Sequence, residues 1–103
     1  METLNFTEKR FQISLAYIEE VLKEKSFSKN DCNSFTNKNK GTTLFVNKLT
    51  NDSVNNNLIL IFILVNELGQ IQLSNTAIIK SDSNIESNFS NIDIALKTLE
   101  PSI

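Results

Sequence analysis

The sequence predicts a small α+β domain in which a three-stranded, mostly antiparallel sheet is packed by a long N-terminal helix and a short C-terminal helix. Three observations predict this class. Apolar residues recur at helical spacing near the N-terminus, β-branched segments alternate with turn-forming residues in the middle, and a second helical stripe precedes Pro101. A chain of 103 residues fits one domain, residues 1–103, with the element order α-β-β-β-α.

The first element is predicted to be an amphipathic helix from Phe6 to Lys25. Asn5 followed by Glu8 resembles a capping box at its start. Its apolar stripe consists of residues three or four positions apart, namely Phe11, Leu15, Ile18 and Leu22. This stripe would cover one face of a sheet.

Three strands are predicted, at 42–50, 58–65 and 70–80, because these segments are rich in β-branched and aromatic residues and are bounded by turn formers. The segment "NELG" predicts a tight turn with Gly69 in the left-handed conformation of a hairpin bulge. The alternation of the third strand breaks near Ser74 and Asn75, which predicts a bulge or a bend there.

The two remaining segments are polar. Residues 26–41 are predicted to be a loop, apart from one helical turn that could open at Ser28, and residues 81–90 a linker; both are expected to be flexible. Ser90 and Asp93 form a second capping box, so the short helix is expected to begin there and to end at Pro101.

The strongest signal is the run of eight apolar residues from Leu58 to Val65. A strand that is apolar on both faces needs cover on both faces. Burying four large aliphatic side chains contributes roughly 6–12 kcal/mol, which is comparable to the whole stability of a small domain, so neither row should remain in water.

Three arrangements would provide that cover. Helices could lie on both faces of a three-layer monomer, the free face could meet a second copy in a homodimer, or it could dock a larger protein. The eight residues form two rows on opposite faces of the strand. One row consists of Ile59, Ile61, Ile63 and Val65. The other row is taken as the candidate partner interface, and its members are Leu58, Leu60, Phe62 and Leu64.

Composition argues against catalysis. The chain has no His, Cys32 is its one cysteine, and Gly41 and Gly69 are its two glycines. A Cys/His zinc site, a His-activated nucleophile and a glycine-rich phosphate loop are therefore ruled out. We expect a non-enzymatic protein with no catalytic residue, no cofactor and no metal.

Four lysines form the candidate polar rim or nucleic-acid contact: Lys29, Lys38, Lys40 and Lys48. Phe35 and Phe45 lie between them in the sequence, as in surfaces that bind single strands. The net charge of −2 and the pI of about 5.0 argue for solvated loops instead, so RNA contact is the weaker alternative.

The N-terminus lacks the pattern of a signal peptide, and the longest apolar run is far shorter than the roughly 17–25 residues of a membrane-spanning helix. We therefore expect a cytoplasmic protein with no membrane partner. Asn, Ile and Lys are abundant, which is typical of low-GC bacteria and their phages; a phage-encoded chain would act in the cytoplasm of the bacterial host.

The segment "FILVNELGQIQLSNTAIIKS" with the helix after it resembles the strand–turn–strand–helix part of TonB- and TolA-type C-terminal domains. The order of elements is similar to that of type III secretion chaperones. The function expected from the sequence is protein binding. Its most concrete form is a small inhibitor in bacterial or phage conflict, such as an anti-CRISPR-like blocker of a defence nuclease or a toxin immunity protein. The alternative is a dimeric cytosolic chaperone or adaptor.

Overall fold

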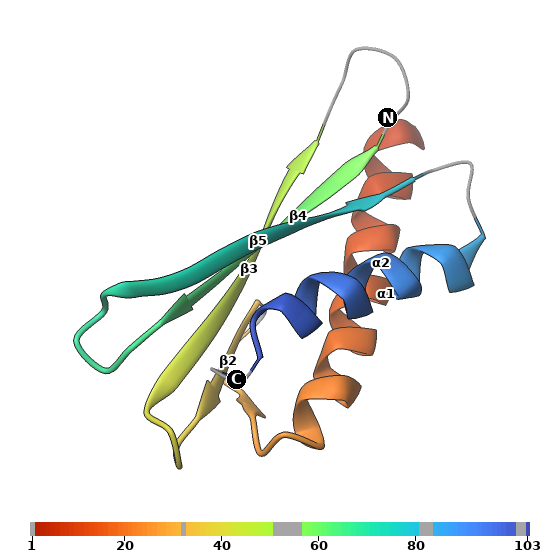
Figure 1. Cartoon of the computed structure of the whole chain (residues 1–103). Coiled ribbons are helices and arrows are strands. Elements are labelled where there is room, and N and C mark those ends of the chain that lie inside the picture. Colours follow the sequence, from red (N-terminus) through yellow and green to blue (C-terminus); the bar gives the residue numbers. More distant parts are fainter. Residues whose placement is uncertain (1, 32, 51–56, 81–83, 101–102) are drawn as a thin grey trace.

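The computed structural model describes residues 2–31, 33–50, 57–80, 84–100 and 103, and its backbone is shown in Figure 1. The elements in chain order are α1 (Glu2–Lys23), β1 (Ser28–Lys29), β2 (Ser34–Asn37), β3 (Thr42–Thr50), β4 (Leu58–Val65), β5 (Ile71–Ile79) and α2 (Ile85–Thr98). The predicted α+β class is confirmed. The sheet has five antiparallel strands in the order β1-β2-β3-β4-β5, whereas three were predicted.

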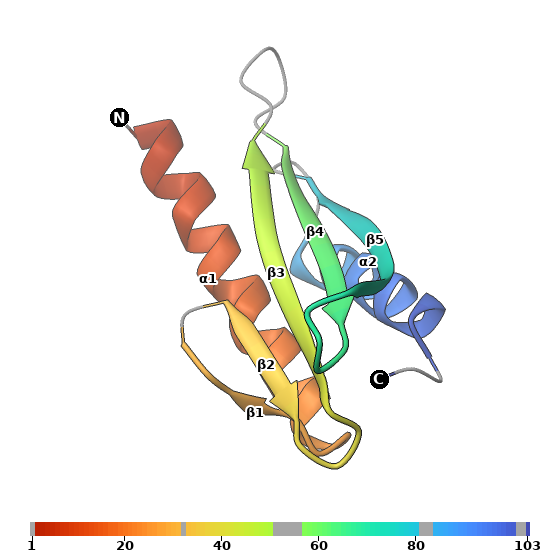
Figure 2. The same ribbon diagram turned by 90° about the vertical axis from the view of Figure 1, so that its left-hand side faces the viewer.

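Both helices lie on the same face of the sheet, as Figures 1 and 2 show from two directions. They contact each other and share one hydrophobic core with the strands. Of the three arrangements considered, the three-layer monomer is therefore wrong. Among the described residues, no helix covers the other face, which we call the open face.

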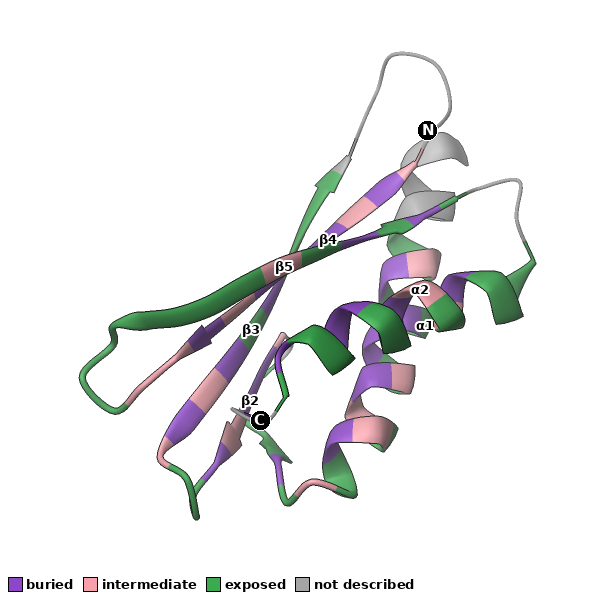
Figure 3. Ribbon diagram, viewed as in Figure 1, coloured by how far each residue is buried: buried purple, intermediate pink, exposed green. Residues whose placement is uncertain are grey.

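The core is formed where the apolar stripes of the helices meet one row of each interior strand. Along β4, buried and half-buried residues alternate strictly, which Figure 3 displays as alternating colours. Helix α1 contributes the stripe that the sequence predicted. The core residues of α1, of α2 and of the C-cap of α2, Leu99, are Phe11, Leu15, Ile18, Leu22, Ile92, Ala95, Leu96 and Leu99.

The polar segment 26–41 contains two short strands rather than a continuous loop. Strand β2 pairs along its whole length with β3, with Phe35 opposite Leu44. Asn37 is buried, and its side chain donates to the carbonyl of Lys25 and accepts from the backbone N–H of Asn39. Such short strands form because a neighbour supplies their hydrogen bonds, so periodicity gave no sign of them. Cys32 lies outside the described residues.

Helix α2 begins earlier than predicted, at Ile85. Its N-cap is Asn84, whose side chain accepts a 2.8 Å hydrogen bond from the N–H of Ser87. Ser90 is therefore inside the helix, and residues 84–90 are not a linker. The first turns of α2 were not predicted because a polar residue, Asn88, occupies a buried position in the apolar stripe of this helix.

The β4–β5 hairpin confirms the predicted role of Gly69, which has a φ of 79°. The bulge lies near this turn rather than at Ser74 and Asn75, which pair regularly with β4. Leu64 pairs with Leu73 and Val65 pairs with Ile71, so the residue between them, Gln72, is the extra one.

Candidate protein-binding face

The open face is built from the alternate residues of β3, β4 and β5. Antiparallel register aligns them in four cross-strand rows, because residues opposite each other project from the same face. From the β4–β5 turn outward, the rows are Thr43–Val65–Ile71, Phe45–Ile63–Ser74, Asn47–Ile61–Thr76 and Leu49–Ile59–Ile78. Eight of these twelve side chains are apolar, and none is charged.

Several of these apolar side chains are well exposed. The exposed fraction is 38% for Phe45, 55% for Leu49, 67% for Ile71 and 46% for Ile78. The β4 residues between them are half-buried, because the side chains of both neighbouring strands shield a row in the sheet interior. A soluble monomer rarely exposes a contiguous apolar patch beyond a few hundred Å² without using it.

The row proposed from the sequence as the partner interface lies on the opposite face. Its members, Leu58, Leu60, Phe62 and Leu64, are completely buried against the helices. A partner would reach them only if a helix moved away, so we correct the candidate interface to the row of Ile59, Ile61, Ile63 and Val65. Both rows are equally apolar, so the alternation of the strand identifies the two rows but does not show which of them faces the helices.

The outer edge of β5 is partly closed by asparagine side chains. Asn88 accepts a 3.0 Å hydrogen bond from the N–H of Lys80 and donates a 3.2 Å bond to its carbonyl, as a neighbouring strand would. Asn91 donates to the carbonyl of Ile78, and the side chain of Asn75 accepts from the N–H of Thr76. Strand addition at this half of the edge is therefore blocked.

The four candidate lysines do not form one patch. Lys29 lies 4.0 Å from Glu19, and Lys40 donates a 2.8 Å hydrogen bond to the carbonyl of Ile103. Lys38 is exposed in the turn between β2 and β3. Lys48 follows Lys40 by eight residues, which is roughly 26 Å along a strand. This separation does not favour a continuous phosphate-binding surface.

Lys48 instead joins β3 to α1 on the covered face. Its ammonium group pairs with Glu8 and lies 4.9 Å from the ring centroid of Phe11. The hydrogen bond from Lys48 lowers the pKa of Glu8 below its usual value. A second ion pair joins Lys25 to Glu100 at 2.8 Å, and its hydrogen bond lowers the pKa of the Glu100 carboxyl group. Both ion pairs connect segments that are distant in the sequence.

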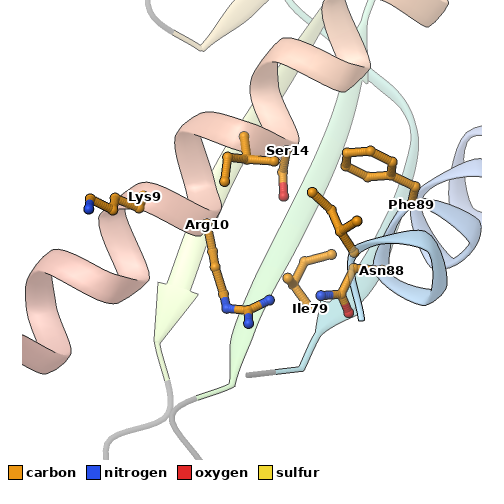
Figure 4. Close-up of a pocket in the computed structure, with 8 residues that line it drawn as sticks. Lys9, Arg10, Ser14, Ile79, Asn88 and Phe89 are labelled. Atoms are coloured by element: carbon orange, nitrogen blue, oxygen red, sulfur yellow. The ribbon is translucent and has the colours of Figure 1, made fainter. Parts of the chain in front are cut away.

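A small pocket lies between the N-terminal part of α1 and the start of α2 (Figure 4). Its volume is about 220 Å³, which is smaller than the roughly 300–1,000 Å³ of sites for drug-sized ligands. Lys9 and Arg10 are the cationic residues of an otherwise mostly apolar lining. The rest of the lining consists of Ile13, Ser14, Ile79, Ile85, Asn88 and Phe89.

In the part of the chain that the structure describes, no three acidic or thiol side chains gather to hold a metal ion. None of the described helices is long and apolar enough to cross a membrane. Comparison of the chain with models of protein families, with curated proteins and with solved structures found no match.

Proposed function

We propose that this chain is a non-enzymatic protein-binding module that docks its partner on the open face. The observation that carries the proposal is the set of four cross-strand rows, which form an uncharged, largely apolar surface beside a complete core. Depletion of charge at the centre and polar residues around it are typical of binding interfaces. The composition of the chain, with no His and a single Cys, supports a role without catalysis.

The more specific form that we propose is a small inhibitor of a larger protein in bacterial or phage conflict. The partner would be a defence nuclease or a toxin, and the chain would act by occluding a surface or by trapping a conformation. The support for this form is the small size, the composition typical of low-GC genomes and an uncharged, largely apolar face that could cover a surface of another protein. The polar rim would include Thr36 and Thr43, whose hydroxyl groups lie 3.1 Å apart.

Capture from lysates of low-GC bacteria, followed by reconstitution with the purified partner, tests the proposal. Ile61→Asp places a charge at the centre of the open face, and Ile94→Asp places the same charge on the solvent side of α2, where the isoleucine is 61% exposed. We expect Ile61→Asp to weaken the reconstituted complex at least tenfold, because a buried unpaired carboxylate is costly.

The variant Ile94→Asp should bind like the wild type. Equal binding by both variants would contradict docking on the open face. The inhibitor form requires, in addition, that a stoichiometric amount of the chain lowers the activity of the captured nuclease or toxin.

A further inference from the structure

We propose that, when no larger target is bound, the open face binds a second copy of this chain, face to face about a two-fold axis. The two sheets would stack, with the helices of each copy on the outside. This inference rests on the proposed function, because it takes the open face as a docking surface, and it names the protein that docks there. A larger target would then compete with the second copy for the same face.

The charge distribution favours self-pairing. A two-fold interface sets a surface against itself, so each charge on it would meet like charges. Across the four rows of β3, β4 and β5, no side chain is charged, although the chain contains ten basic and twelve acidic residues. Lys48, the one charged residue of β3, points to the covered face and pairs with Glu8. Two open faces can therefore meet without repulsion.

The size of the face fits a weak dimer. Three strands spaced by roughly 4.8 Å and seven residues with a rise of about 3.3 Å each give the face a footprint on the order of 350 Å². Two copies would therefore bury about 700 Å² of footprint, which is in the range of weak, transient interfaces. Ile61 lies in the middle of this area, between Asn47 and Thr76 in the same row. We expect dissociation on dilution to micromolar concentrations.

The edges of the sheet offer a poorer surface for a second copy. Strand β1 has only two residues. At β5, the side chains of Asn75, Asn88 and Asn91 occupy backbone groups from Thr76 to Lys80. Pairing of copies edge to edge would have to displace these bonds or use the short stretch Ile71–Asn75, whereas stacking of the open faces displaces none of them.

Sedimentation velocity from about 1 µM to about 500 µM tests the stoichiometry. We expect the mass to rise from 11.6 kDa toward twice that value. Ile61→Asp should raise the dimer dissociation constant at least tenfold, because it sets two carboxylates together in an apolar interface. Ile94→Asp should associate like the wild type.

Cross-linking tests the geometry. In a Cys32→Ser background, Thr76→Cys places a thiol on the open face, and Ser90→Cys places one on the exposed side of α2. A short bismaleimide should join two copies through position 76 and not through position 90.

A wild type that stays monomeric at the highest concentration overturns the second copy as partner. The proposed function would then still stand if capture of another protein depends on Ile61. A dimer that Ile61→Asp leaves intact, or that cross-links equally well at both positions, overturns the face-to-face arrangement. Dimerisation that Ile61→Asp abolishes and Ile94→Asp does not, with cross-linking restricted to position 76, supports it.

Discussion

Tyr17 links the two helices through its hydroxyl group and its ring. The hydroxyl lies 2.7 Å and 2.8 Å from the two carboxylate oxygens of Asp93, to which it donates. The ring stacks on Phe89 with centroids 4.0 Å apart. The hydrogen bond to Asp93, with partial burial and the negative charge, raises the pKa of Tyr17 to about 12. The helical periodicity of the sequence did not reveal this bond.

The raised pKa makes the stability of the protein depend on alkaline pH. The unfolded tyrosine loses its proton near pH 10.0 and the folded one near pH 12. The contribution of Tyr17 is therefore fully present below pH 10.0 and is lost as the pH rises toward 12. Tyr17→Phe keeps the stacking and removes the bond, so we expect it to cost about 1–2 kcal/mol at pH 8.

Urea unfolding at a series of pH values checks this prediction. The difference between wild type and Tyr17→Phe should shrink between pH 10 and pH 12, because effects common to both proteins cancel in this difference. Asp93→Asn, which keeps an acceptor without the charge, should show a smaller dependence than the wild type. A constant difference across the series would exclude the Tyr17–Asp93 bond as its source.

At the scale of elements, asparagine takes the place of backbone at several ends and edges. Asn84 caps α2, Asn88 closes the edge of β5, and Asn37 fixes the turn into β3. The side chain of Asn66 accepts from the N–H groups of Leu68 and Gln70 in the β4–β5 turn. Composition alone suggested a genomic bias as the reason for fifteen asparagines; the structure adds a physical role for several of them.

Helix α1 ends in a Schellman-type motif that contains a serine where glycine is usual. The N–H of Phe27 donates to the carbonyl of Leu22 at 3.0 Å, and the N–H of Ser26 donates to that of Lys23 at 3.2 Å. Ser26 has a φ of 69°. A side chain in this left-handed region costs roughly 1–2 kcal/mol relative to glycine.

Ser26→Gly is therefore expected to stabilise the protein by about 1 kcal/mol, somewhat less than the strain relieved, because glycine also loses more entropy on folding. The midpoint of urea denaturation measures the gain. Ser26→Ala is the matched control, since alanine keeps the Cβ atom and should not stabilise. If the glycine and alanine variants have the same midpoint, the motif is not strained.

At the scale of the whole molecule, neighbouring residues of β4 have opposite roles. Phe62 is completely buried beneath the helices, whereas Ile61 lies half-buried on the open face. Phe62→Asp would bury an unpaired carboxylate and leave a cavity, so it should cost more than about 4 kcal/mol and unfold the chain. Ile61→Asp should cost only about 1–2 kcal/mol, mainly through lost strand propensity.

Circular dichroism of the two variants, at concentrations low enough to avoid association, provides the comparison. Ile61→Asp should keep the helical signal and a cooperative melt, and Phe62→Asp should lack both. The reverse result would place the helices on the other face of the sheet. Two unfolded variants would mean that the open face is also needed to stabilise the monomer.

The sequence by itself determined the elements that carry their own periodicity. Strands β3 and β4 have the predicted bounds, because β-branched runs between turn formers define a strand locally, and the stripe of α1 forms the predicted part of the core. The sequence did not reveal β1 and β2. These segments of two and four residues become strands only because neighbouring strands supply their hydrogen bonds.

Only the tertiary structure decided which face of the sheet is open. Leu58–Val65 presents two apolar rows of similar hydrophobicity, and nothing local distinguishes them. Which row becomes buried depends on the face of the sheet on which the two helices pack. That face is set by the connections and the packing between segments that are distant in the sequence. Because both helices lie on one face, the row of Ile61 is left open and the row of Phe62 becomes the core.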